Sequence, residues 1–283
     1  MTDGTPLIDS HLHLWDITSG GYAWLTPEAG ALYDTFTADE AQAELAASGV
    51  TGAVLVQADD TDADTDSMLR VAAGRAWVSG VVGWVPLEHP AAAEARLEEL
   101  AEHPVFCGVR HLVHEDPRDG FLELDGVRRS LAALARRGLA FDVPNAWPRH
   151  LDATAPLAAA LPELTVVIDH LGKPPRGRDD FAAWRASFEA ASRLPNTVAK
   201  VSGLDVPGQG STADDLREVW SIALEAFGPA RMLWGSDWPV TTISGGYAET
   251  LATLMSLVDE LSADERTAVR GGTATRVYRL GGR

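Results

Sequence analysis

The chain has 283 residues and carries 23 Lys and Arg against 41 Asp and Glu, a formal net charge of −18. This acidic balance excludes nucleic acid and anionic membrane surfaces as expected partners, because both require clustered basic side chains. A single cysteine, Cys107, excludes an intramolecular disulfide and is typical of a reducing compartment. The sequence shows no secretory signal and no apolar run of about 20 residues, so we expect a cytoplasmic protein without a membrane span.

Short apolar runs recur along the chain at intervals too long for β-hairpins. Most of them are continuous rather than alternating, which is typical of parallel strands covered on both faces. We expect strands at 7–10, 53–57, 80–85, 105–110, 139–143, 165–169, 197–201 and 231–235.

Helical segments with recognisable ends lie between these runs. Thr37 and Glu40 have the spacing of a capping box, and Gly49 marks the end of the helix that follows. A further helix at 125–137 is expected to end at Gly138.

Eight strands that alternate with helices predict an α/β fold, a single (β/α)8 barrel of the TIM type that spans residues 1–283 as one domain. An open, doubly wound sheet is the competing architecture, because a strand count does not prove closure. The irregular, tryptophan-containing segment 14–36 is expected to lie over the barrel mouth.

Polar residues stand where several of these strands end, which is where barrel enzymes place their chemistry. The first strand leads into His11 and His13, and alternation along an extended segment puts both imidazoles on one side. The sixth strand leads into His170 and the eighth into Asp237. Alone, a pair of histidines or an Asp before a Trp-Pro turn also fits a structural role. Together, these four groups at the ends of three strands predict a site.

The chain resembles the amidohydrolase superfamily, in which a His-x-His motif follows the first strand and an Asp follows the last. Finer matches indicate its second amidohydrolase family, and within it the sugar-lactonase-like branch that holds L-fuconolactonase and L-rhamnonolactonase. The strings that carry this resemblance are DSHLHLWD (9–16), VQADD (56–60), VVGWVPL (81–87), GVRHLV (108–113), VIDHLGKPP (167–175), KVSGL (200–204), LWGSDWPV (233–240) and ATRVYRL (274–280).

The resemblance implies a hydrolase that opens the lactone of a sugar acid or related carboxylic acid. Asp237 is then the general base that takes a proton from the attacking water. His170 orients this water or protonates the ring oxygen that leaves. His11, His13 and Asp237 are expected to hold a divalent metal, with zinc first.

The chain departs from the metal-dependent members of the superfamily at two strands. The fourth strand offers Arg110 and His111 rather than a carboxylated Lys or a Glu, and the fifth carries no His. A metal-independent reaction therefore stays open, with Arg110 and the histidines stabilising the oxyanion.

The expected partner is a small-molecule lactone. Flat aromatic faces suit the C–H faces of a sugar ring, and Arg110 is able to grip a carboxylate. The candidate substrate-binding residues are Arg110, His111, Trp15, Trp24, Trp84 and Trp238.

Two other functions compete with lactone hydrolysis. One is a metal-dependent decarboxylase of the same superfamily, which the missing histidine on the fifth strand disfavours. The other is a non-catalytic barrel that binds sugar acids, which the joint presence of His11, His13, His170 and Asp237 disfavours. The sequence does not predict the ring size or stereochemistry of the lactone, the pathway or the oligomeric state.

Overall fold

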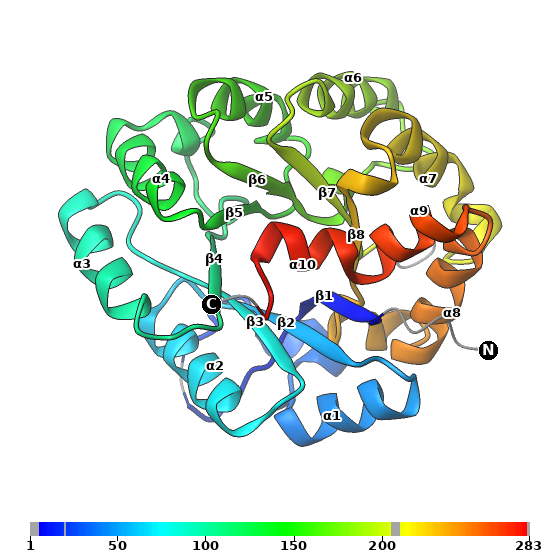
Figure 1. The fold of residues 1–283 in the computed structure, drawn as a ribbon, viewed down its shortest axis with the longest axis horizontal. Helices are drawn as coiled ribbons and strands as arrows, with labels where there is room; N and C mark the ends of the chain where they lie inside the picture. Colours follow the sequence, from blue (N-terminus) through cyan, green and yellow to red (C-terminus); the bar gives the residue numbers. More distant parts are fainter. Residues whose placement is uncertain (1–5, 20, 205–209, 282–283) are drawn as a thin grey trace.

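The computed structural model describes residues 6–19, 21–204 and 210–281, and its centre is one parallel sheet of eight strands. The strands follow each other around the sheet in chain order, as Figure 1 shows from one end. Each predicted apolar run forms one of them, with ends that shift by up to two residues. They are β1 (Ile8–Leu12), β2 (Gly52–Val56), β3 (Val78–Gly83), β4 (Phe106–Arg110), β5 (Ala140–Val143), β6 (Thr165–Ile168), β7 (Thr197–Val201) and β8 (Met232–Trp234).

The sheet closes between the end of β1 and the residues directly after β8. Leu12 pairs with Trp238 in a parallel bridge. The backbone N–H of His13 donates to the carbonyl of Trp238 at 2.7 Å, and that of Asp237 donates to the carbonyl of His11 at 2.9 Å. The predicted (β/α)8 barrel is therefore confirmed, and the open sheet is excluded.

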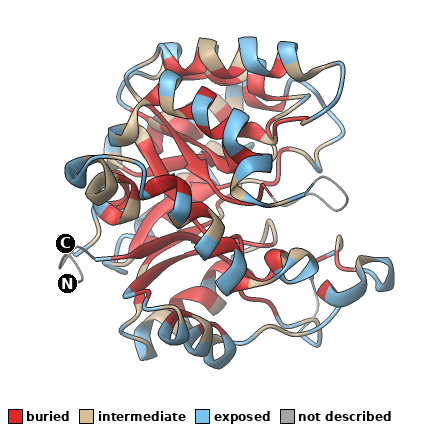
Figure 2. Cartoon of the chain, turned by 90° about the vertical axis from the view of Figure 1, so that its right-hand side faces the viewer, coloured by how far each residue is buried: buried red, intermediate tan, exposed pale blue. Residues whose placement is uncertain are grey.

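Helices surround the barrel and bury its outer face, while their own outward faces are exposed (Figure 2). The capping box of Thr37 and Glu40 is present, and Gly138 ends the expected helix with φ 63°. None of the described helices is long and apolar enough to cross a membrane. They are α1 (Ala38–Ala47), α2 (Asp62–Gly74), α3 (Pro90–Leu100), α4 (Asp125–Arg137), α5 (Leu151–Ala160), α6 (Phe181–Ser192), α7 (Ala213–Phe227), α8 (Tyr247–Val258), α9 (Ala263–Thr267) and α10 (Thr273–Tyr278).

The described part of segment 14–36 lies over the barrel mouth. Trp15 and Phe36 pair through their backbones, and the indole N–H of Trp24 donates to the carbonyl of Ala58 just beyond β2 at 2.7 Å. The rings of Trp15 and Trp24 meet edge to face, with their centroids 5.2 Å apart. Two aromatic rings are thereby fixed above the C-terminal ends of the strands.

The opposite end of the barrel is sealed by α10, which lies across it in Figure 1. Val277 and Tyr278 of this helix pack against inward-facing strand residues such as Val54, Val82 and Val167. The hydroxyl of Tyr278 reaches up the barrel axis and donates to Oδ2 of Asp142 at 2.7 Å. Helix α10 thus contacts Asp142, a buried charged residue inside the barrel.

Replacing Tyr278 with Phe should lower the free energy of unfolding by about 1–3 kcal/mol, because a buried carboxylate then loses a hydrogen-bond donor. Asp142 is fully buried, and its Oδ1 has no hydrogen-bond partner among the described residues. Bulk water therefore cannot readily replace the lost donor. Urea unfolding of Tyr278→Phe beside Tyr33→Phe measures the effect, since Tyr33 is 44% exposed. Equal losses in the two variants would contradict the prediction.

Candidate active site

A cavity of about 220 Å³ opens at the C-terminal ends of the strands. Among the predicted residues, its lining includes His13, Arg110, His170 and Asp237, with Trp15 and Trp24 on the side of the mouth segment. His11 lies directly beneath this surface and is fully buried. The position agrees with the rule that barrel enzymes place their chemistry at this end.

His11, His13 and Asp237 converge at the bottom of the cavity. The two Nε2 atoms are 3.0 Å apart, and Oδ1 of Asp237 lies 3.5 Å from that of His11 and 3.4 Å from that of His13. The closing backbone bonds between β1 and the end of β8 hold the three residues together.

These three residues fit a divalent metal. His13 Nδ1 lies 2.8 Å from the carbonyl oxygen of Val56, so Nδ1 carries the hydrogen and Nε2 of the neutral ring presents a lone pair. This lone pair faces another imidazole nitrogen and a carboxylate oxygen, an arrangement that a cation stabilises. Two His and one Asp with an orienting carbonyl behind one imidazole form a common metal-binding set.

His170 is held beside this group by a sharp turn. It lies in the short 3-10 segment Asp169–Gly172, where His170 has φ 55° and Leu171 φ 51°. Its Nδ1 is 2.9 Å from the hydroxyl of Ser202, and its Nε2 is 4.0 Å from Oδ1 of Asp237. The turn therefore directs the ring toward the carboxylate.

A buried ion network supports the bottom of the cavity. The ammonium of Lys200 on β7 lies 2.6 Å from Oδ2 of Asp142 and 3.2 Å from Oδ1 of Asp169. Nε of Arg110 donates to Oδ2 of Asp169 at 2.9 Å. Burial lowers the pKa of Lys200, but the two carboxylates outweigh it and raise the pKa above its usual value. Lys200 is therefore a permanent positive charge inside the barrel.

The two groups nearest the cavity differ in charge at neutral pH. Burial raises the pKa of Asp237, but the nearby imidazoles and Lys173 together outweigh burial and hold the pKa below its usual range. Burial lowers the pKa of His170 to about 3. The site thus offers an ionised carboxylate beside a neutral imidazole.

The family model of amidohydrolases matches residues 8–280. The chain belongs to the amidohydrolase family. An L-fucono-1,5-lactonase from Burkholderia ambifaria is 35% identical over 96% of this chain and 95% of its own. A solved amidohydrolase from Burkholderia multivorans with bound zinc is 30% identical, with a TM-score of 0.85 over 97% of this chain and 99% of its own.

A 5-carboxyvanillate decarboxylase from Sphingomonas paucimobilis has a TM-score of 0.63 over 98% of this chain and 100% of its own. At 17% identity, this likeness shows a shared fold alone.

Three aromatic residues predicted to bind substrate lie outside the described cavity lining of this amidohydrolase. The indole of Trp84 donates to Nδ1 of His111 at 3.0 Å, and the His111 ring stacks on Phe121 with centroids 4.4 Å apart. Trp238 is buried and packs edge to face on Phe36, while its backbone closes the barrel. Each of the three side chains therefore has a protein partner, and their role in binding substrate stays a prediction.

The cavity also contains polar residues that the sequence did not single out. His114, Asn145 and Lys173 line it from the loops after β4, β5 and β6. Asn145 has φ 42° and Lys173 φ 58°, and His170 and Asp237 share this left-handed conformation. Such strain gathers at functional sites when the surroundings enforce it. Lys173 lies within the string VIDHLGKPP, which carries part of the family resemblance, and this string could have identified Lys173 as a candidate site residue.

Asp60 lies beside the site and predicts a pH dependence of stability in this amidohydrolase. Burial raises its pKa from 3.8 to about 7. Between these values, the folded protein binds more protons at Asp60 than the unfolded chain does, so stability contributed by this group falls as pH rises.

We expect Asp60→Asn to gain stability relative to wild type as pH rises from about 5 to 7, and the difference to level off above that. The amide keeps an oxygen for the N–H of Leu112 and the side chain of Gln57 but does not ionise. Urea unfolding of both proteins at several pH values measures the difference. A difference that stays constant across this range would show that Asp60 titrates normally.

Proposed function

We propose that this amidohydrolase opens the lactone of a sugar acid by attack of water on the lactone carbonyl, with a zinc ion as its metal. The convergence of His11, His13 and Asp237 at the bottom of the cavity carries this proposal. The similarity to L-fucono-1,5-lactonase over nearly the whole chain supports the substrate class.

His11, His13 and Asp237 would hold the metal, and the zinc-bound relative supports zinc as its identity. When bound, a divalent ion lowers the pKa of water and polarises the carbonyl. The carbonyl of Val56 keeps the His13 ring in the orientation and tautomer that this role needs.

Asp237 acts as the general base in this proposal. Its carboxylate is ionised, and it lines the cavity, so it accepts a proton from water as the water oxygen bonds to the lactone carbon. The ring C–O bond then breaks, and the leaving oxygen needs a proton. In this proposal His170, whose Nε2 is 4.0 Å from Oδ1 of Asp237, passes the proton on.

The upper cavity suits a sugar ring. Trp15 and Trp24 contribute aromatic surface to its lining. Arg110 and Lys173, which also line the cavity, bring positive charge that suits the carboxylate of the product. Contacts from Nε to Asp169 and from Nη1 to the carbonyl of Gln57 fix the plane of the Arg110 guanidinium.

The decarboxylase alternative is less well supported. The decarboxylase relative shares the fold at 17% identity. On β5, where the sequence analysis found no histidine, Asp142 is paired with Lys200 and is not among the described residues that line the cavity. A binding protein without catalysis would show no turnover in the assays below.

A pH-indicator screen of sugar 1,4- and 1,5-lactones tests the proposal, because opening a lactone at neutral pH releases a proton. We expect turnover of at least one sugar lactone and none of hydroxybenzoate-type acids. Release of CO2 from an aromatic acid, with no lactone hydrolysed, would favour the decarboxylase instead.

Asp237→Asn should lower kcat by about 10²–10⁴, because the amide keeps the shape of the side chain but does not accept the proton. Thermal unfolding measured beside the kinetics separates lost chemistry from lost structure. Asp60→Asn is the matched control, since Asp60 lies near the mouth but outside the described cavity lining. A folded Asp237→Asn enzyme that keeps more than about a tenth of wild-type kcat would rule out this base.

Replacing His11 and His13 with Ala should abolish stoichiometric zinc binding, because two of the three converging ligand atoms are removed. Metal content after dialysis, measured by mass spectrometry, checks this result. His103→Ala is the control. His103 is exposed and lies between α3 and β4, so this variant should keep its metal. Full turnover of metal-free wild type would show that the reaction does not need the ion.

A further inference from the structure

Gly203, two residues after the end of β7, lies directly beside His170 and Asp237. Its φ is 52°, a left-handed conformation that glycine adopts without strain. A methyl group on its α-carbon would lie 2.5 Å from Oδ2 of Asp237 and closer still to Nδ1 of His170. Non-bonded carbon contacts are favourable only from about 3.5 Å outward. The absence of a side chain at Gly203 therefore lets these two groups from different strand ends come within 4.0 Å of each other, measured from Nε2 to Oδ1.

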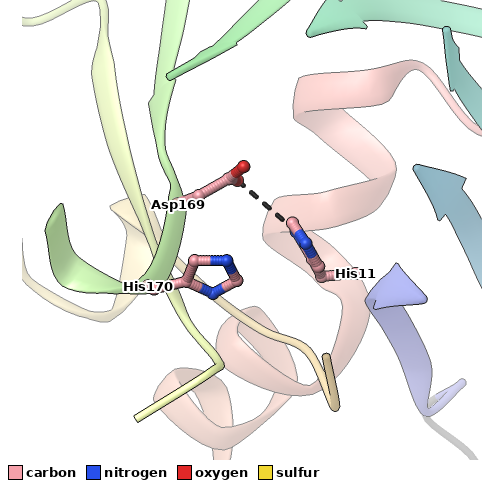
Figure 3. A group of neighbouring side chains, drawn as sticks. All are labelled: His11, Asp169 and His170. Carbon is pink, nitrogen blue, oxygen red and sulfur yellow. Dashed lines mark ion pairs between the residues drawn. The ribbon is translucent and has the colours of Figure 1, made fainter. Parts of the chain in front are cut away.

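The ring of His170 has little freedom to move away from such a methyl group. The hydroxyl of Ser202, a fully buried residue just before Gly203, lies 2.9 Å from Nδ1 of the ring. The ring of His11 meets that of His170 edge to face, with centroids 4.6 Å apart, and Figure 3 shows the two rings next to each other. The position of His170 is therefore fixed by more than one neighbour.

The backbone at Gly203 is held as well. Nζ of Lys173 donates to its carbonyl at 2.8 Å. Toward α7 and α8, a space of about 10 Å³ lies beside Gly203, and Leu216 and Leu254 help to enclose it. This space gives the backbone little room to withdraw. A side chain at this position would therefore change the spacing of the two functional groups.

This spacing matters for the reaction proposed above, on which the inference rests. In that reaction Asp237 accepts a proton from water and His170 passes a proton on, so the two groups have to keep their positions relative to each other. A carbon atom at 2.5 Å would have to displace its neighbour by about 1 Å. A misplacement of this size is able to lower a rate about 10²-fold.

We propose that Ser202 and Gly203 are positioning residues for His170 and Asp237. The missing side chain of Gly203 sets the distance between the two groups, and the hydroxyl of Ser202 fixes the imidazole ring. Neither residue is among the described residues that line the cavity, so both act through His170 and Asp237 rather than through contact with the substrate.

Gly203→Ala tests the proposal. We expect kcat to fall about 10²-fold while KM stays nearly unchanged, because the groups are displaced but the cavity lining keeps its residues. Kinetics on a lactone that the wild type hydrolyses measure this split. Crystal structures of both proteins give the distance between Nε2 of His170 and Oδ1 of Asp237, which should be longer in the variant.

Gly177→Ala is the matched control for backbone strain. Gly177 lies after β6, is exposed and has φ 68°, and a methyl group on its α-carbon would meet nothing within 4 Å. This variant should lose stability through the same left-handed strain but keep wild-type kcat, which thermal unfolding and kinetics measure side by side. Equal losses of kcat in the two glycine variants would overturn the proposal, because strain and not spacing would be the cause.

Ser202→Ala covers the case in which Gly203→Ala does not fold. It removes the bond to His170 without adding bulk, so kcat should fall while KM stays nearly unchanged. Ser130→Ala is its control, because Ser130 is also buried and donates its hydroxyl to the carbonyl of Leu87, away from the cavity lining. This control should keep wild-type kcat.

A folded Gly203→Ala enzyme with wild-type kcat, or with an unchanged distance between His170 and Asp237, would overturn the proposal. If Gly203→Ala does not fold, wild-type kcat in Ser202→Ala would overturn it. A wild type that hydrolyses no lactone would contradict the proposed function instead, and the distance in the two crystal structures would still decide whether Gly203 sets the spacing.

Discussion

The buried ion pair between Lys200 and Asp142 is the interaction on which the interior of this barrel depends. It joins β7 to β5, and Asp169 and His11 extend it to β6 and β1. A charge in this position is costly without its partners, and removal of one member of a buried pair typically costs about 3–5 kcal/mol. Since the partners lie on different strands, the charges are balanced only when the barrel is closed in the correct order. The pair therefore favours one arrangement of strands over its competitors.

The closure of the barrel and the geometry of the site have the same origin. The backbone bonds that join the end of β1 to the residues after β8 involve His11, His13 and Asp237 themselves. The carboxylate of Asp9 strengthens the same junction, because it accepts the N–H groups of His11 and Ser236. A local opening at this seam would separate the side-chain atoms of His11, His13 and Asp237 that converge in the cavity.

The sequence predicted the parts of this structure that depend on local pattern. Short apolar runs, most of them continuous, marked all eight strands, and alternation placed His11 and His13 on one side. The partners of Lys200 were not predictable, because Asp142 is 58 residues away and becomes a neighbour only when the barrel forms. The same applies to Trp84 and His111, which bond to each other. Loop residues such as Asn145 follow no periodicity, so no sequence pattern predicted that they line the cavity.

The left-handed backbone of Asn145, His170, Lys173 and Asp237 has a consequence for the evolution of the enzyme. Glycine would adopt these angles with little strain, whereas each side chain present costs of order 1–3 kcal/mol. Selection for a more stable chain would therefore favour glycine at four places around one cavity, and each exchange would remove a functional group. With these four side chains present, the barrel gives up part of the stability that glycine would allow.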